Sequence, residues 1–227
     1  MTIKISSTKD FAANGVKILV YGPPGSEKTR MCATAPRPII LSAEAGLLSL
    51  SEQDTPVIEI TSKDELSEAY EFLTESEEAK KFDTICLDSI TEVAEVLLTT
   101  YKGEEKDPRA AYGRLNDDMA STIRSFRDIK GKNVYFTAKQ VKFVNDENGI
   151  TSFMPGMPGK TLLNGLSFFF DEVFASRLGK LEDGTVYRYL QTSADLNYEA
   201  KDRSGKLEAK AEPDLTSIFN QIMAPKK

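Results

Sequence analysis

The clearest structural signal in this chain of 227 residues is Val16-Lys-Ile-Leu-Val-Tyr-Gly-Pro-Pro-Gly-Ser-Glu-Lys-Thr29. Its apolar run, Ile18 to Tyr21, is typical of a buried β-strand. The run is followed by Gly22-Pro-Pro-Gly25, and glycine and proline favour a turn. Lys28-Thr29 then open a helix. The sequence therefore predicts a strand, a glycine-rich turn and a helix in direct succession.

This succession is that of the phosphate-binding P-loop, in which backbone N–H groups and the helix N-terminus hold phosphates. The lysine reaches the β- and γ-phosphates, and the following hydroxyl meets Mg²⁺. We therefore expect Lys28 to act on the γ-phosphate and Thr29 to bind the metal. The residues expected to contact ATP are Gly22, Pro23, Pro24, Gly25, Ser26, Glu27, Lys28, Thr29 and Arg30. The alternative is a plain strand–turn–helix corner with no ligand.

Glu27 departs from the P-loop pattern G-x-x-x-x-G-K-[ST], which has glycine at that position. That glycine often adopts a left-handed backbone, which costs other residues about 1–2 kcal/mol. A carboxylate beside phosphates adds repulsion of about 1 kcal/mol when hydrated and about 4 kcal/mol when partly shielded. We expect nucleotide binding weakened by about ten- to a thousandfold. Binding need not be abolished, because the rest of the pattern is present.

Composition sets broad limits on the class of protein. Hydrophobic residues make up 40% of the chain and charged residues 28%, as in ordinary globular proteins. The net charge of −6 means that any nucleic acid would be bound through local basic segments. Two cysteines, Cys32 and Cys86, and no histidine indicate neither a disulfide framework nor a zinc site. Without a visible signal peptide or membrane span, we expect a cytoplasmic protein with no membrane association.

The order of elements predicts an α/β fold in one domain over residues 1–227. Strands and helices alternate through residue 137, and a β-rich region follows. This order favours a mostly parallel sheet flanked by helices, with antiparallel strands added at the C-terminal edge. Residues 1–14 form a short N-terminal arm in which Ile3–Ile5 could be a strand. We expect Lys102–Pro108 to be a loop and residues 141–160 to be a long, irregular loop, which is usually functional or disordered.

Ligands in such sheets bind at the carboxyl ends of the strands, where Glu44, Asp88 and Gln140 are expected. Asp88 can hold Mg²⁺ beside the Thr29 hydroxyl, or it can simply cap the next helix. Glu44 can orient or deprotonate the water that attacks the γ-phosphate, or it can be an exposed loop carboxylate. The Gln140 amide can sense the γ-phosphate and pass its presence to the following loop.

Three segments carry a family resemblance. Ser42-Ala-Glu-Ala45, Cys86-Leu-Asp-Ser89 and Thr137-Ala-Lys-Gln140 stand in the order seen in RecA-type recombinases. The chain resembles still more the small RecA-like phage ATP-binding proteins, whose studied members are single-strand annealing proteins of the Sak type. That resemblance extends over residues 15–222 and is carried by Lys17–Thr29, Thr34–Leu50, Tyr112–Asn116 and Ala200–Leu207.

The resemblance implies a RecA-like P-loop ATPase core in which Glu44 is the catalytic carboxylate, Asp88 the Walker B acid and Gln140 the switch. It implies that two loops, 102–114 and 141–160, bind DNA, through phosphate contacts and base stacking. The residues available there are Lys102, Lys106, Arg109, Arg114, Lys142, Phe143, Phe153 and Lys160. The two aromatic residues can instead pack the second loop against the body. Lys201 and Arg203 resemble residues that reach a neighbouring subunit's ATP, although a solvated hairpin end explains them equally.

The first functional hypothesis is therefore a DNA-dependent ATPase that binds or anneals single-stranded DNA in phage-type recombination. It would work with ATP and Mg²⁺, as a filament or ring, in the cytoplasm of a phage-infected or prophage-bearing bacterium, with a single-strand binding protein as a further partner. The second hypothesis is a DNA-binding scaffold, nucleotide-binding or nucleotide-insensitive, whose ATP hydrolysis is lost through Glu27. A third is a P-loop protein that acts on a partner helicase or a small molecule instead of DNA.

Overall fold

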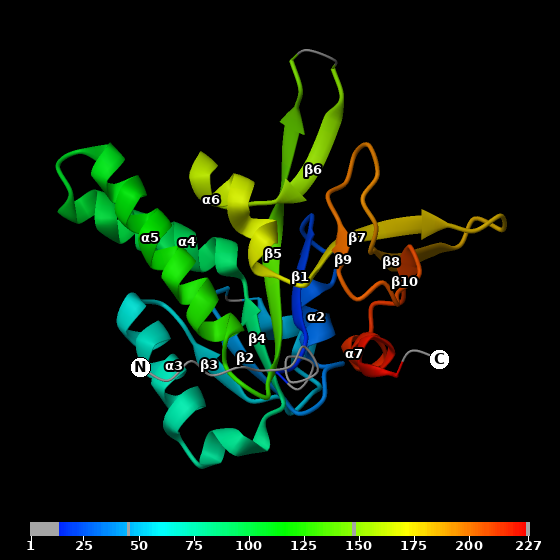
Figure 1. Cartoon of the computed structure of the whole chain (residues 1–227), viewed down its shortest axis with the longest axis horizontal. Helices are drawn as coiled ribbons and strands as arrows, with labels where there is room; N and C mark the ends of the chain where they lie inside the picture. Colours follow the sequence, from blue (N-terminus) through cyan, green and yellow to red (C-terminus); the bar gives the residue numbers. More distant parts are fainter. Residues whose placement is uncertain (1–13, 45, 147–148, 226–227) are drawn as a thin grey trace, which may run out of the picture.

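The computed structural model describes residues 14–44, 46–146 and 149–225 and shows an α/β fold built on one mixed sheet (Figure 1). Within these residues the strand order is β10-β8-β7-β1-β5-β4-β2-β3, with β6 paired to β5 and β9 paired to β7. The strands are β1 Lys17–Gly22, β2 Pro38–Ser42, β3 Val57–Glu59, β4 Thr84–Asp88, β5 Asn133–Val144, β6 Thr151–Pro155, β7 Glu172–Lys180, β8 Val186–Gln191, β9 Lys201–Asp202 and β10 Lys210–Ala211.

Helices connect and cover these strands. The α-helices are α2 Lys28–Cys32, α3 Lys63–Glu75, α4 Ile90–Glu104, α5 Pro108–Arg127, α6 Lys160–Gly165 and α7 Leu215–Met223. Three short 3₁₀ helices are η1 Leu47–Leu50, η2 Glu78–Lys81 and η3 Leu166–Phe169. Among the described residues, no helix is both long enough and apolar enough to cross a membrane.

The centre of the sheet is parallel. β7, β1, β5, β4, β2 and β3 all run in one direction. Beyond β7, β8 pairs antiparallel with β7, and β10 pairs antiparallel with β8. The predicted fold class, a mostly parallel sheet with antiparallel strands at the C-terminal edge, is confirmed. Because the parallel strands end at the same edge, residues that follow β1, β2 and β4 are brought together there.

The two faces of the sheet bury different layers. Every residue of β1 is buried, and alternate side chains point to opposite faces. Leu19 and Tyr21 pack in the larger core, with α3, α4 and α5, while Ile18 and Val20 pack in a second core with α2 and α7. The apolar face of α5 follows helical spacing, and Leu115, Met119, Ile123 and Phe126 are all buried.

The predicted loop over 102–114 is wrong. α4 continues through Gly103 to Glu104, and α5 begins at Pro108, so a short turn of residues 105–107 joins two long helices. Asp107 ends the turn, because its side chain accepts a hydrogen bond from the N–H of Arg109 and proline is suited to the first helical position. The polar composition of this segment reflects the exposed ends of two helices.

The predicted long loop over 141–160 is also wrong. β5 extends to Val144 and turns back into β6, which makes an antiparallel hairpin that projects beyond the rest of the sheet (Figure 1). Alternating β-formers, Val141, Phe143 and then Thr151 and Phe153, account for this pairing. Residues 147–148 of the turn lie outside the described residues. After β6 the chain enters α6, whose first residue is Lys160.

Several smaller features complete the description of the fold. A tight turn at residues 182–184 joins β7 to β8, and α7 is the last helix. Both cysteines are buried and free. The short strand β9 covers Lys201–Asp202, and Tyr198 before it makes an isolated bridge to Phe153. The predicted N-terminal arm, except for Asn14, lies outside the described residues.

Candidate nucleotide-binding site

The P-loop joins the carboxyl end of β1 to the start of α2. Gly22 is the last residue of β1, and Lys28 is the first of α2. Glu27 precedes the helix with φ 64° and ψ 24°, in the left-handed region where glycine is favoured. Glu27 therefore adopts the left-handed conformation that the glycine of the pattern often has. The sequence departs from the P-loop pattern here, but the backbone keeps the shape that the pattern requires.

Lys28 lies across the turn. Its Nζ donates hydrogen bonds to the carbonyl oxygens of Gly22 and Pro23, at 3.1 and 3.2 Å, and to Ser26 Oγ at 3.3 Å. Burial lowers the pKa of Lys28 from its usual value, and the charges of Asp88 and Glu44 partly oppose this shift. A partly desolvated ammonium aimed at oxygen acceptors is the group expected to meet a phosphate.

Asp88 lies at the end of β4 and is almost fully buried. Thr29 Oγ1 donates a hydrogen bond to its Oδ2 at 2.6 Å, and Thr137 Oγ1 donates another to its Oδ1. The capping role considered for Asp88 belongs to Ser89, whose Oγ accepts a hydrogen bond from the N–H of Glu92. A carboxylate and a hydroxyl in contact are hard oxygen ligands of the kind that Mg²⁺ prefers. These residues fit the metal that the P-loop pattern implies.

Glu44 follows β2 and is half-buried. Its Oε1 accepts a hydrogen bond from Ser89 Oγ at 2.5 Å, and its carbonyl oxygen accepts one from Ser42 Oγ at 2.6 Å. Ser89, which the sequence reasoning did not single out, therefore connects the two acidic segments. The carboxylate is positioned rather than free, which is what a group that orients a water molecule requires.

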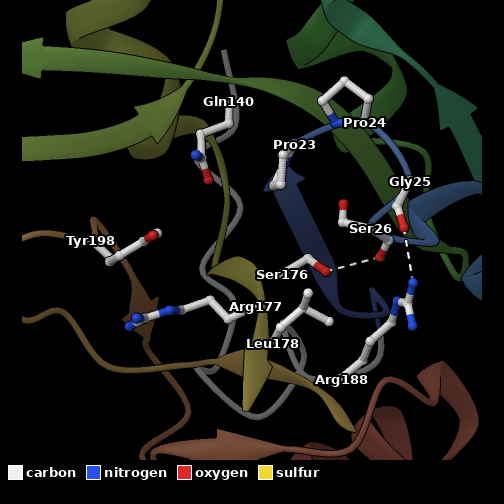
Figure 2. A pocket seen from close by; sticks show the side chains of 10 residues that line it. All are labelled: Pro23, Pro24, Gly25, Ser26, Gln140, Ser176, Arg177, Leu178, Arg188 and Tyr198. Carbon is white, nitrogen blue, oxygen red and sulfur yellow. Dashed lines mark hydrogen bonds between the residues drawn. The ribbon is translucent and has the colours of Figure 1, made fainter. Parts of the chain in front are cut away.

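Gln140 does not end its strand as expected. It lies within β5, opposite Pro155 of β6, where the hairpin leaves the main sheet. It lines a cavity of about 300 Å³ that the P-loop also lines (Figure 2). The lining residues are Pro23, Pro24, Gly25, Ser26, Gln140, Ser176, Arg177, Leu178, Arg188 and Tyr198. Gln140 thus lies at the base of the projecting hairpin and lines the same cavity as the P-loop.

Sequence reasoning missed five residues of this cavity, which come from β7, β8 and the segment after β8. Ser176 Oγ donates a hydrogen bond to the carbonyl of Ser26 at 3.0 Å, and the Arg177 guanidinium stacks on the Tyr198 ring, 3.9 Å from its centroid. Arg188 reaches the P-loop from β8 and donates to the carbonyl of Gly25 at 3.1 Å. Strand residues far along the chain give no local motif, so only the sheet order reveals them.

The proposed DNA contacts fall into two groups. Lys102, Lys106, Arg109 and Arg114 lie around the α4–α5 turn, where Arg114 pairs with Glu104 at 2.5 Å and the Lys102 ammonium lies over the Tyr112 ring. Lys142 and Phe143 are exposed on the hairpin, and Lys160 starts α6. Phe153 instead stacks on Tyr198, with ring centroids 4.8 Å apart, as the packing alternative described.

Lys201 and Arg203 make contacts within this chain. Lys201 Nζ donates to the carbonyl oxygens of Ser167 and Phe170, at 2.7 and 2.6 Å. Arg203 pairs with Asp171 at 3.0 Å, near the first residues of β1 rather than its P-loop end. The structure therefore does not bring these two side chains to the P-loop of their own subunit.

A P-loop whose threonine donates a hydrogen bond to a buried aspartate at the end of a nearby parallel strand, beside the P-loop lysine, defines a P-loop NTPase. The family described as AAA domain matches residues 14–204, and the chain belongs to that family.

Among solved structures, a KaiC-like protein from the hyperthermophilic archaeon Pyrococcus horikoshii OT3 is similar, with 14% sequence identity and a TM-score of 0.42. The similarity covers 78% of this chain and 77% of that one. No curated protein matches this chain.

Proposed function

We propose that this protein binds ATP with Mg²⁺, hydrolyses it, and binds or anneals single-stranded DNA in recombination of the phage type. The observation that carries the nucleotide part is the hydrogen bond from Thr29 to Asp88 beside the Lys28 ammonium. Lys28 and the backbone of residues 22–29 hold the phosphates. Thr29 and Asp88 hold the metal, which when bound neutralises charge on the phosphates.

Glu44 is the residue proposed to act on water. Its carboxylate accepts a hydrogen bond from Ser89 at the same sheet edge, and its negative charge acts to raise the pKa of Lys28. We assign it the orientation of the water that attacks the γ-phosphate. A carboxylate that is held at one oxygen by a hydroxyl keeps its other oxygen available for this purpose.

The projecting hairpin is the proposed DNA contact. Lys142 and Phe143 are exposed on it, which suits a phosphate contact and a stacked base. Gln140 lies on the same strand, at the base of the hairpin, and borders the P-loop cavity, so a nucleotide-dependent change there can reach Lys142 and Phe143 along β5. The resemblance to phage annealing proteins supports the choice of single-stranded DNA.

The assembly is part of the proposal. We assign ATP to a boundary between copies of this chain in a filament or ring, with Lys201 and Arg203 contacting the neighbour's nucleotide. A single-strand binding protein is a further partner, in the cytoplasm of a bacterium that carries the phage. The internal contacts of Lys201 and Arg203 would have to be exchanged on assembly.

The test is ATP hydrolysis by the purified protein, with and without single-stranded DNA. Stimulation by DNA that is lost in Lys28→Ala and reduced in Phe143→Ala supports the proposal. Hydrolysis that is unchanged in Lys28→Ala contradicts the site.

Glu27 favours a second candidate, a DNA-binding P-loop scaffold that does not hydrolyse ATP. The variant Glu27→Gly separates the two functions. A large gain in hydrolysis in this variant, from an inactive natural chain, supports the scaffold. Equal activity of both chains supports the ATPase.

A further inference from the structure

Glu27 places a negative charge inside a loop proposed to bind phosphates, and the structure pairs that charge with two arginines. Glu27 Oε1 lies 3.4 Å from the guanidinium of Arg188 and 3.5 Å from that of Arg30. Arg30 is three residues along the chain, so its proximity follows from helix geometry. Arg188 comes from β8, on a strand far away in the sequence. Arg188 reaches Glu27 because β8 joins the sheet beside β7, which in turn pairs with β1.

Arg188 contacts the backbone of the P-loop as well as the Glu27 carboxylate. The same nitrogen, Nη2, also donates a hydrogen bond to the carbonyl of Gly25 at 3.1 Å (Figure 2). Its contacts therefore bridge two points of the P-loop, on either side of Ser26. Arg188 Nε is buried and has no hydrogen-bond partner among the described residues.

Side chains of β7 and β8 contact neighbouring residues of the P-loop. Ser176 of β7 donates to the carbonyl of Ser26, one residue from the Arg188 contact. Gly22 allows this close approach, because a Cβ there would lie 2.6 Å from Ser26 Oγ and 3.0 Å from Ser176 Cβ. The P-loop is thus held from its outer side at three successive residues, Gly25, Ser26 and Glu27.

We propose that Arg188 is a positioning residue for the nucleotide, which neutralises Glu27 and holds the loop in its phosphate-accepting shape. This inference rests on the proposed nucleotide binding and explains how a P-loop tolerates glutamate in place of glycine. An unpaired carboxylate would repel the phosphates, and a loop without the Gly25 contact would lose its fixed form. Arg188 prevents both, through one guanidinium.

A double-mutant cycle on nucleotide affinity tests the charge part. We would measure binding of a non-hydrolysable ATP analogue with Mg²⁺ by calorimetry, in the natural chain, Arg188→Ala, Glu27→Gln and the double variant. Arg188→Ala is expected to weaken binding about tenfold in the natural chain, but less than about threefold when Glu27 is already glutamine. The matched control is Arg127→Ala, because Arg127 is also paired with an acidic residue, at the end of α5 and away from the P-loop. Equal losses in both backgrounds would overturn the pairing.

A measurement without nucleotide tests the clamp separately. Amide hydrogen exchange over residues 22–28 is expected to be faster in Arg188→Ala than in the natural chain, and unchanged in Arg127→Ala. Arg188→Lys is expected to fall between them, because one ammonium pairs with Glu27 but lacks the guanidinium's planar fork. Unchanged exchange in Arg188→Ala would refute the clamp, whatever the binding results.

Together, the two measurements distinguish failure of the Arg188 inference from failure of the proposed nucleotide binding on which it rests. If no chain binds the analogue but exchange rises in Arg188→Ala, the nucleotide proposal fails and the positioning role toward nucleotide fails with it, while the grip on the loop is real. If the natural chain binds and the cycle shows no coupling, the function survives and the role of Arg188 is wrong. Comparison of the unfolding temperatures excludes general loss of structure, and Arg188→Gln replaces any alanine variant that does not fold.

Discussion

Thr29 and Asp88 are separated by 59 positions in the chain, yet Thr29 Oγ1 donates a hydrogen bond to Asp88 Oδ2 at 2.6 Å. The parallel sheet makes this contact, because β1 and β4 both end at the same edge with only β5 between them. Thr137 of that intervening strand donates to the other carboxylate oxygen. Strands β4 and β5, and helix α2 that follows β1, therefore each contribute one oxygen-bearing side chain to the proposed metal position.

Asp88→Asn is expected to remove most of the dependence of nucleotide binding on Mg²⁺, because an amide oxygen is a weaker ligand than a carboxylate. We expect a loss of about ten- to a hundredfold in the apparent affinity for Mg²⁺. Titration of the metal at fixed nucleotide measures it, with Asp183→Asn on the exposed β7–β8 turn as the control. An unchanged Mg²⁺ requirement in Asp88→Asn would refute the metal assignment.

Glu44→Gln is expected to slow ATP hydrolysis about a hundredfold or more, since the amide cannot act as a base toward water. The hydrogen bond from Ser89 can be kept by the amide oxygen, so nucleotide affinity is expected to stay nearly the same. Single-turnover hydrolysis and binding, measured on the same preparation, check both parts. Glu52→Gln, on an exposed segment after η1, is the control. A Glu44→Gln protein that hydrolyses ATP normally would exclude Glu44 as the catalytic carboxylate.

Phe143→Ala is expected to weaken binding of single-stranded DNA, because a stacked base contributes about 1–3 kcal/mol. The Phe143 side chain is 54% exposed, so the unfolding temperature should not change. Phe168→Ala is a matched control, since Phe168 is 79% exposed and lines a surface hollow with Lys17, at the opposite end of β1. Fluorescence anisotropy with a labelled oligonucleotide measures the affinity. Equal affinities for Phe143→Ala and the natural chain would remove the hairpin from the DNA contact.

Glu172 predicts a pH dependence of stability. Burial, with a contribution from the charge of Asp202 on β9, raises its pKa to about 8 from a usual value of 4.5. The folded protein therefore keeps this proton where the unfolded chain has lost it, and stability falls as pH rises from about 4.5 to 8. The slope attributable to this group is about 1.4 kcal/mol per pH unit.

Thermal unfolding of Glu172→Gln between pH 5 and 7.5 checks this dependence. The variant is expected to lose less stability with rising pH than the natural chain, whereas Glu182→Gln, on the exposed β7–β8 turn, should follow the natural chain. Parallel curves for Glu172→Gln and the natural chain would show that Glu172 is ionised in the folded state throughout this range.

The sequence predicts most of the central fold and of the P-loop, for a physical reason. The stretch Val16–Thr29 contains an apolar run, a turn and a helix start in direct succession, so neighbouring residues alone predict its structure. Asp88 and Glu44 are recognisable because each follows an apolar run. The hairpin after Val141 was harder to predict. Its composition is rich in turn-forming residues, and its pairing partner, β6, lies beyond the turn. Pairing across the turn overrode the local composition.

Contacts between distant strands were not predictable. Nothing in the sequence near Arg188 indicates a role at the P-loop, because its position depends on β8 joining the sheet beyond β7. The helices around 102–114 were missed for a different reason. Gly103 and Pro108 favour a loop in isolation, but packing of α4 against α5 keeps one helix intact and proline begins the next.

The central claim is that the P-loop binds nucleotide although it carries Glu27. Calorimetric titration of the natural chain and of Lys28→Ala with a non-hydrolysable ATP analogue and Mg²⁺ tests it most directly, with Lys130→Ala as a surface control. The account predicts micromolar binding by the natural chain and the control, and a loss of about a hundredfold or more in Lys28→Ala. Absence of binding up to millimolar analogue, or equal binding by Lys28→Ala, would contradict it.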